Sequence, residues 1–350
     1  MSYSVDVDRY ELVSAEEFLR QMPQRGRPLR LKHLDLTVYG IQDCLCFGDA
    51  TTVVLPFQGE SLRYIFRESC NYRANEFTLP HILAQCLAGN PEPLDIDEAA
   101  SLCLPGMENL WHWMAEGLPK LLALESIGYT GKYIIADNAM IRQFMELLHI
   151  DPARLLPGKG TYRVQRLMLP QRLSGFDLVE YMPLTELMRD ALLRAVGRLD
   201  GTKRLYVQRI GRRKPANEKE VLALLDEFGF TVMVPEDFSL KEQLRCMTNV
   251  TCSVMAHGAN AALTLMQPPR SALIELFSNR YVSYNNLHTA RLLRLRYHPL
   301  VEDLDVSSSP ANDMLLSTFL ESGFATDMLV DLRHLRTVLE SILDTPEAKH

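Results

Sequence analysis

The sequence of 350 residues lacks several features that mark particular classes of protein. It has no basic excess: 44 acidic side chains outnumber 37 Lys and Arg, and the net charge of −7 disfavours nucleic acid as a partner. It has no run approaching the roughly 18 apolar residues of a membrane-spanning helix. With 47% apolar and 23% charged residues, the composition is that of a folded globular chain.

Cysteines are also sparse, and their placement shows no zinc pattern. The seven cysteines are scattered, and Cys44 and Cys46 form the one close pair. A structural zinc site needs a tighter cluster of ligands, so we predict reduced core thiols and no metal site.

The N-terminal stretch MSYSVDVDRYELVSAEEFLRQ does not have the pattern of a secretory signal peptide. It carries acidic residues where a signal peptide is basic and then apolar, which predicts a cytoplasmic protein. The basic stretch at residues 24–32 could contact anionic lipid at a membrane surface, and a solvated loop is the alternative.

The length favours two domains, because single cores rarely grow beyond about 250–300 residues. Alternating Val, Thr and aromatic residues at 31–56 predict a small β meander. Helices and strands then alternate: we expect helices at 108–124, 138–148 and 184–196, and strands at 132–136 and 162–169. The polar segment 197–203 is the predicted boundary between domains 1–198 and 199–350.

The second half is a run of βα units, which predicts a parallel Rossmann-like sheet. The expected strands are 204–208, 231–234, 251–256 and 272–277, and the expected helices are 218–228, 240–247 and 260–266. Asn217 with Glu220 and Ser239 with Glu242 have capping-box spacing, and Gly229 suits a helix C-terminus. Two further helices are expected after residue 314.

The stretch TCSVMAHGANAALTLMQ, residues 251–267, predicts an anion site. A strand leads through a turn at His257 and Gly258 into a helix, whose first amide groups lack partners and lie at the positive end of its dipole. Gly258 allows a tight turn, Ala259 keeps the helix start thin, and His257 adds a side-chain donor. Close packing of a helix on a sheet is the alternative.

Three arginines follow the strand predicted at 204–208: Arg209, Arg212 and Arg213. They would lie at the carboxyl end of a parallel strand, where open α/β sheets bind ligands. Guanidinium groups bind phosphate bidentately, so a diphosphate is the expected ligand. A solvated basic turn is the alternative.

Two carboxylates have the same placement at strand ends. Glu275 and Glu236 could accept hydrogen bonds from ribose hydroxyls, or could form salt bridges with neighbouring arginines.

In the first half, His112 and Glu116 are four residues apart on one face of a predicted helix. Such a pair could take a proton from a hydroxyl, with Glu116 the preferred base. The alternative is that Trp111 and Trp113 are core anchors, while His112 and Glu116 form an ordinary i,i+4 pair beside a kink at Pro119. The Asp-x-Asp sequences at Asp95 and Asp303 are too short to indicate a function, and Asp95 and Asp97 are expected to cap a helix.

Several of these motifs occur in an order that resembles the family 61 glycosyltransferases, which include bacterial capsular polysaccharide enzymes and eukaryotic xylosyl- and N-acetylglucosaminyltransferases. From about 206 to 277 the resemblance rests on Arg209, Arg213, Asn217-Glu218, GFTVMVPEDFSLKEQ (229–243), HGA (257–259) and IEL (274–276). In the first half WHWMAEGLPKL is similar to a further family element, with Lys120 where the family has Arg.

The resemblance implies a GT-B fold, with two Rossmann-like domains facing a cleft, and an inverting transfer from a nucleotide sugar without an essential metal. We expect a UDP-linked donor, a hydroxyl of a glycan or glycolipid as acceptor, and a role in surface polysaccharide biosynthesis. The donor site would comprise Arg209, Arg213, His257, Gly258, Ala259, Glu275 and Glu236, with Glu116 or His112 as the base. There are two alternatives. One is a dinucleotide-dependent oxidoreductase, which lacks support because the GxGxxG motif is absent. The other is a non-catalytic protein that binds a nucleotide or a sugar.

Overall fold

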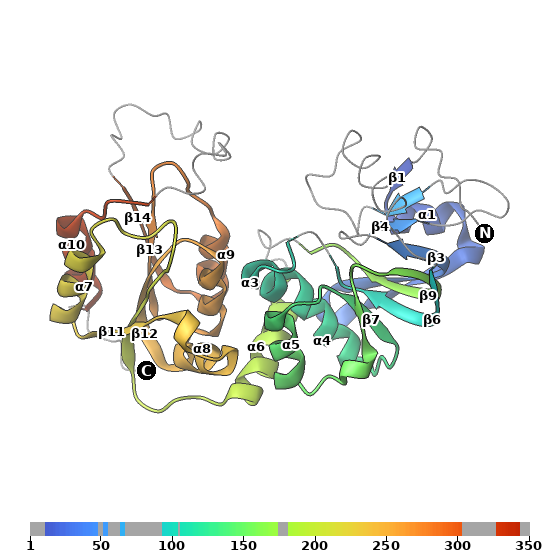
Figure 1. The fold of residues 1–350 in the computed structure, drawn as a ribbon, viewed down its shortest axis with the longest axis horizontal. Helices are drawn as coiled ribbons and strands as arrows, with labels where there is room; N and C mark the ends of the chain where they lie inside the picture. Colours follow the sequence, from blue (N-terminus) through green and yellow to red (C-terminus); the bar gives the residue numbers. More distant parts are fainter. Residues whose placement is uncertain are drawn as a thin grey trace. The chain divides into compact units, whose positions relative to one another are not determined.

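A computed structural model describes residues 11–47, 52–54, 64–66, 93–103, 106–173, 181–302 and 327–343. The chain divides into two compact units, one of residues 1–175 with 180–191 and one of residues 176–179 with 192–350. Each unit has its own sheet (Figure 1). None of the described helices is long and apolar enough to cross a membrane. The domain limits 1–198 and 199–350 stay a prediction.

Unit 1 contains a mixed sheet of nine strands within its described residues. The order along the sheet is β1-β5-β4-β3-β9-β6-β7-β8, with β2 also paired to β3. The strands are β1 (Glu11–Val13), β2 (Gly26–Leu31), β3 (Leu36–Phe47), β4 (Thr52–Val54), β5 (Tyr64–Phe66), β6 (Leu94–Ser101), β7 (Lys132–Ile135), β8 (Leu155–Pro157) and β9 (Thr161–Pro170). The helices are α1 (Ala15–Gln21), α3 (Leu110–His112), α4 (Leu118–Ser126), α5 (Ala139–Leu147) and α6 (Met182–Val196).

The predicted meander at 31–56 is part of this larger sheet. Its antiparallel strands are present, because β2 pairs with the first half of β3 and β4 with the last residues of β3. The other edge of β3 pairs with β9, more than a hundred residues further along the chain. The prediction of a small separate meander is therefore wrong in extent, since both edges of the twelve-residue β3 need hydrogen-bond partners.

The predicted helix at 108–124 is present but contains a π-helical turn. Asn109 caps its start, with Oδ1 accepting from the N–H of Trp111 at 2.9 Å. Residues Trp113–Gly117 are π-helical, and the N–H of Leu118 donates to the carbonyl of Trp113, five residues earlier. Pro119 follows at the start of α4 and has no N–H for a carbonyl four residues back, which explains the wider turn.

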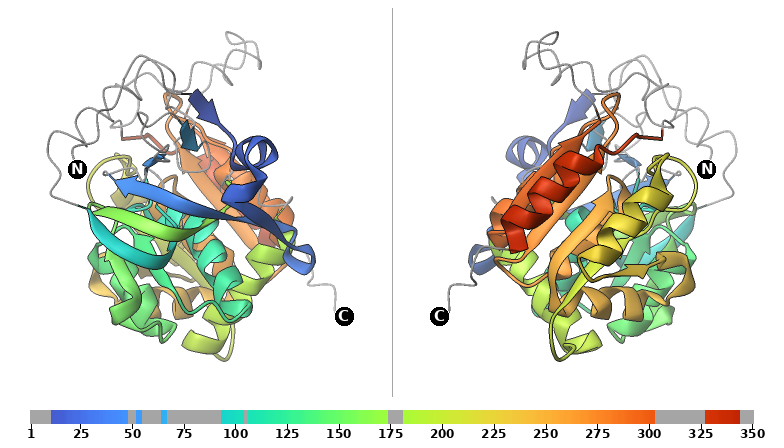
Figure 2. Two further views of the ribbon diagram at one scale, coloured as in Figure 1. Left: turned by 90° about the vertical axis from the view of Figure 1, so that its right-hand side faces the viewer. Right: turned by 90° about the vertical axis from the view of Figure 1, so that its left-hand side faces the viewer.

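Unit 2 contains a sheet of five parallel strands in the order β11-β10-β12-β13-β14, compatible with a Rossmann-like fold. The strands are β10 (Lys203–Val207), β11 (Phe230–Met233), β12 (Val250–Ala256), β13 (Ala272–Phe277) and β14 (Arg296–Val301). The helices are α7 (Glu218–Glu227), α8 (Leu240–Cys246), α9 (Asn285–Leu293) and α10 (Leu332–Leu343). Helices α7 and α10 lie side by side on one face, where Val221, Leu225, Leu335 and Leu339 are buried against the sheet (Figure 2).

Of the two capping boxes predicted in unit 2, one is present and one is absent. The capping box forms at Ser239 and Glu242, and Gly229 follows α7 in a left-handed conformation at φ 69°. Asn217 makes no cap; its side chain instead exchanges two hydrogen bonds with the backbone of Val330, at 2.9 and 3.0 Å. The capping box predicted at Asn217 is therefore wrong, because a distant segment binds the amide.

The other elements of unit 2 agree with the prediction in part. The helix predicted at 260–266 is a 3-10 helix, Ala259–Met266. Helix α9 and strand β14 were not predicted: α9 has no side-chain cap, and β14 contains Pro299, which only an edge strand accommodates readily. Of the two helices expected after residue 314, α10 is present, and residues 314–326 lie outside the described part of the chain.

Candidate active site

The strand order of unit 2 defines where a ligand is expected to bind. From β10 the chain adds β11 on one side, and then crosses to add β12, β13 and β14 on the other side. In such doubly wound sheets, the crevice at the carboxyl ends of the two strands where the order reverses is the usual ligand site. Here those two ends lead to Arg209 and His257.

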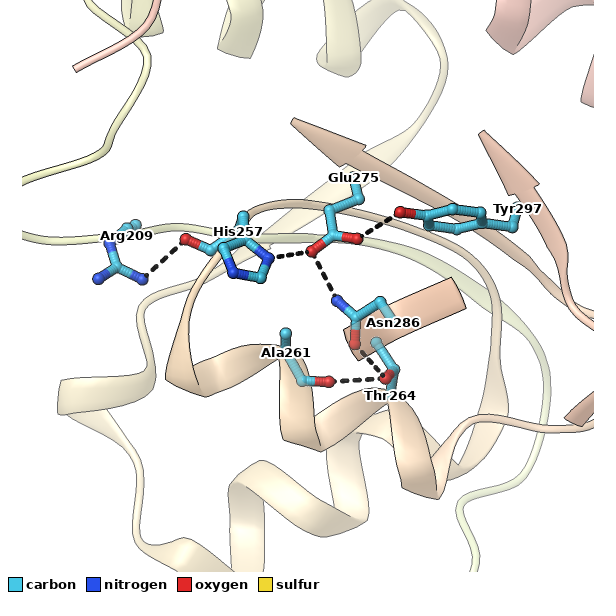
Figure 3. A network of polar contacts seen from close by, with 7 residues as sticks. All are labelled: Arg209, His257, Ala261, Thr264, Glu275, Asn286 and Tyr297. Atoms are coloured by element: carbon cyan, nitrogen blue, oxygen red, sulfur yellow. Dashed lines mark hydrogen bonds and ion pairs between the residues drawn. The ribbon is translucent and has the colours of Figure 1, made fainter. Parts of the chain in front are cut away.

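Arg209 links the two strand ends directly. Its Nη1 donates to the carbonyl of His257 at 3.3 Å (Figure 3). Its Nε donates to the carbonyl of Arg212 at 2.7 Å. Burial, followed by repulsion from Arg213 and Arg212, lowers the pKa of Arg209 to about 10, while Glu236 acts in the opposite direction. The loop thus holds a partly desolvated cation that an anion would stabilise.

The surroundings of Gly258 differ from those predicted. Its backbone is extended, with φ 165° and ψ −168°, so the expected turn conformation that only glycine favours is absent. A Cβ atom at Gly258 would instead lie 1.6 Å from Nη1 of Arg209. The missing side chain therefore makes room for the Arg209 guanidinium beside Ala259, at the start of the 3-10 helix.

His257 and Glu275 form a buried hydrogen-bonded pair between adjacent strands (Figure 3). Nδ1 of His257 lies 2.6 Å from Oε1 of Glu275. The same carboxylate accepts hydrogen bonds from Asn286 Nδ2 at 2.8 Å and from the Tyr297 hydroxyl at 2.7 Å. Because Glu275 is 0% exposed and engages three partners, the predicted contact with ribose hydroxyls is not available to it. Its partners among the described residues are His257, Asn286 and Tyr297, so the predicted salt bridge with an arginine is not seen there.

Aromatic side chains hold the imidazole ring of His257 from two directions. The Phe277 ring stacks on it with centroids 5.1 Å apart, and the Tyr281 ring is tilted at 5.2 Å. With Nδ1 engaged by Glu275, Nε2 is the ring nitrogen available to a ligand. A protonated Nε2 would donate to an anion.

The structure brings most of the predicted donor-site residues together. Arg209, Arg213, His257, Gly258 and Ala259 lie around the ends of β10 and β12. Glu236 is exposed in the turn after β11, the strand next to β10.

Sequence reasoning missed three residues of this cluster. Tyr281 follows the end of β13 and could have been found by its position after a strand. Asn286 and Tyr297 lie on α9 and β14, the two elements that the sequence did not predict.

The candidate base lies in unit 1, on the helical segment that contains the π turn. Nδ1 of His112 lies 3.3 Å from Oε1 of Glu116, and their side chains are 33% and 12% exposed. Lys120, one turn further, is buried. The predicted i,i+4 pair is therefore present, whereas its role in proton transfer stays a prediction.

Other candidate positions have structural roles or fall outside the described residues. Asp95 and Asp97 lie in β6, where Asp95 pairs with Arg163 at 3.2 Å, so the predicted helix cap is wrong. Cys44 and Cys46 are buried in β3, and burial raises the pKa of both thiols. Asp303 and Asp305 lie outside the described part of the chain.

Comparison with known proteins finds one similar family. The family model for glycosyltransferase 61 matches residues 110–274, from the start of α3 to Ile274 in β13. This range contains His112, Glu116, Arg209, Arg213 and His257. No curated protein matches the chain. The match over residues 110–274 supports membership of glycosyltransferase family 61.

Proposed function

We propose that the protein is an inverting glycosyltransferase that transfers a sugar from a nucleoside-diphosphate sugar, UDP-linked in our expectation, to a hydroxyl of a glycan or glycolipid. The proposal includes a GT-B architecture and a role in surface polysaccharide biosynthesis. The observation that carries it is the cluster of Arg209, Arg213 and His257 at the strand ends where the sheet order of unit 2 reverses.

The cluster suits a diphosphate leaving group. During transfer the bond from the anomeric carbon to the diphosphate oxygen breaks, and negative charge grows on that oxygen. Arg209 and Arg213 carry fixed positive charge in partly buried positions, where it acts more strongly than in water. Glu275 would contribute through His257, by holding its ring with Nδ1 inward and Nε2 toward the ligand.

The proposed base is the Glu116 carboxylate of unit 1. In an inverting transfer the acceptor oxygen forms the new bond on the opposite face of the anomeric carbon, and its proton passes to a base. Glu116 is paired with His112 at 3.3 Å and keeps 12% of its side chain exposed, so both groups are candidates for this step.

Metal independence is part of the proposal, because two guanidinium groups can supply the charge that a divalent ion supplies in other transferases. We expect activity to survive treatment with a chelator. Loss of turnover on chelation and recovery with Mg²⁺ or Mn²⁺ would contradict this part.

A donor panel tests the function. UDP-, GDP- and CMP-sugars are incubated with a library of glycan acceptors, and nucleotide release and product are measured for wild type, Arg209→Ala and His257→Ala. We expect turnover with one nucleotide class, and about a tenfold to hundredfold weaker UDP binding in Arg209→Ala, because a hydrogen bond to a charged group is lost. Arg245→Ala, an exposed arginine of α8, is the matched control and should bind normally. Nucleotide binding without transfer across the whole panel would favour a binding protein, and reduction of NAD with substrate would favour an oxidoreductase.

A further inference from the structure

Tyr281 lies in an ordered turn directly after β13. Its N–H donates to the carbonyl of Ser278 at 3.1 Å, and the hydroxyl of Ser278 accepts from the N–H of Arg280 at 3.2 Å. This turn carries the Tyr281 ring to the ends of β12 and β10, where it meets side chains of both strand ends.

Two of the proposed donor-binding residues contact the same Tyr281 side chain. The His257 ring is tilted against it at 5.2 Å, and the Arg213 guanidinium carbon lies 5.4 Å from the ring centroid. Against the effect of burial, a side-chain hydrogen bond with Tyr281 also raises the pKa of Arg213. Tyr281 is therefore the side chain that joins the arginine loop after β10 to the histidine after β12.

Arg213 needs such a support. Its backbone has a left-handed conformation with φ 62°, which is uncommon for any residue other than glycine. Its Nε is buried and has no hydrogen-bond partner among the described residues. Burial lowers the pKa of Arg213, as expected for a cation that has lost water and has not gained a carboxylate. Such a group retains a donor for an incoming oxyanion, provided that its orientation is maintained.

We propose that Tyr281 is a positioning residue of the donor site: through its hydroxyl and ring it holds Arg213 and His257 in the orientations that bind the diphosphate of the nucleotide. The inference rests on the proposed function, because the ligand is taken to be a diphosphate. Tyr281 acts through its two neighbours and not by contact with the reacting atoms.

The first test measures binding of inorganic pyrophosphate and of UDP to the full chain by calorimetry. Tyr281→Phe keeps the ring and removes the hydroxyl, and we expect about a threefold to tenfold weaker binding, the effect of one hydrogen bond. Tyr281→Leu also removes the ring and should weaken binding further. Tyr284→Phe, three residues along and 41% exposed, is the matched control and should bind as wild type. Thermal melting checks that each variant is folded.

A double-mutant cycle separates positioning from general damage to the fold. If the hydroxyl acts through Arg213, Tyr281→Phe should have no further effect once Arg213→Ala is present. Additive effects of the two changes, unchanged binding in Tyr281→Phe, or failure of the wild type to bind pyrophosphate would each overturn the inference.

The outcomes remain distinct from those of the donor panel. Coupled pyrophosphate binding without turnover of any nucleotide sugar would reject the proposed function alone. If the wild type turns over a nucleotide sugar but the effects of Tyr281→Phe and Arg213→Ala on binding are additive, this inference alone would be rejected.

Discussion

The molecule contains two histidine–glutamate pairs that differ in how they are assembled. His112 and Glu116 are four residues apart on one helical segment, 3.3 Å from each other, and both side chains are partly exposed. His257 and Glu275 are eighteen residues apart at the ends of adjacent strands, 2.6 Å from each other, and almost entirely buried.

The surroundings of the two pairs differ as much as their spacing. The Glu275 carboxylate also accepts from Asn286 and Tyr297, and the His257 ring packs between Phe277 and Tyr281. The pair in unit 1 keeps access to solvent, which a proton-transfer group requires. The comparison indicates that one pair is suited to exchange protons and the other to hold a side chain in place.

The largest expected effect concerns the partly exposed pair, His112 and Glu116. Glu116→Gln keeps the shape of the side chain but removes its basicity, so kcat should fall about 10²–10⁴-fold, the usual contribution of a general base. The dissociation constant for UDP should stay unchanged, because the proposed donor site lies at the strand ends of unit 2. Steady-state kinetics and calorimetry measure the two quantities. If His112→Gln abolishes turnover while Glu116→Gln preserves it, the base is the histidine.

The second prediction concerns the buried pair. Glu275→Leu leaves three buried donors without an acceptor and should lower the free energy of unfolding by about 3–5 kcal/mol, as for a broken buried pair. Glu116→Leu should cost less than Glu275→Leu, because His112 and Glu116 keep 33% and 12% of their side chains exposed whereas Glu275 is fully buried.

Tryptophan fluorescence assigns each loss to its unit. Trp111 and Trp113 are the two tryptophans of the chain, and both belong to unit 1. In urea, Glu275→Leu should shift the transition seen by circular dichroism and leave the fluorescence transition in place. Equal losses in the two variants would contradict the distinction between the pairs.

The smallest expected effect is a pH dependence of pyrophosphate binding, which we expect to come from Arg209 beside the buried pair. Because the pKa of Arg209 is lowered to about 10, pyrophosphate binding should weaken by about tenfold as pH rises through this value and the charge is lost. Above this pH the folded protein binds fewer protons at Arg209 than the unfolded chain does, so Arg209 makes the fold more stable as pH rises. Unfolding caused by Arg209 therefore does not explain the weaker pyrophosphate binding. Arg209→Ala should remove the step. Glu116→Gln should retain it, and a step that persists without Arg209 would reject the assignment.

Much of the fold was predictable because the signals are local. In unit 2, apolar runs separated by polar helices located four of the five strands, and Ser239 with Glu242 marked the start of α8. Where a distant segment competes, the same rules failed. Asn217 has the sequence of a cap, yet Val330 takes both of its hydrogen bonds.

The candidate site was predictable in part for the same reason. Arg209, Arg213 and His257 follow strands, and the carboxyl ends of parallel strands meet at one edge of a sheet. The partners of Glu275 could not be found, because Asn286 and Tyr297 lie on elements with weak local signals. The contact at Gly258 could not be predicted either, because the guanidinium that occupies the space beside it belongs to Arg209, 49 positions earlier.

The sequence by itself determined which residues follow the strands, the spacing of His112 and Glu116, and the order of motifs that resembles family 61. These properties depend on neighbours along the chain, which set helix and strand formation. Only the tertiary structure decided that Glu275 is enclosed by three donors, that Arg209 occupies the space beside Gly258, and that Tyr281 joins Arg213 to His257. Each of these contacts arises where strands distant in sequence end beside one another, and burial there sets which polar groups must pair.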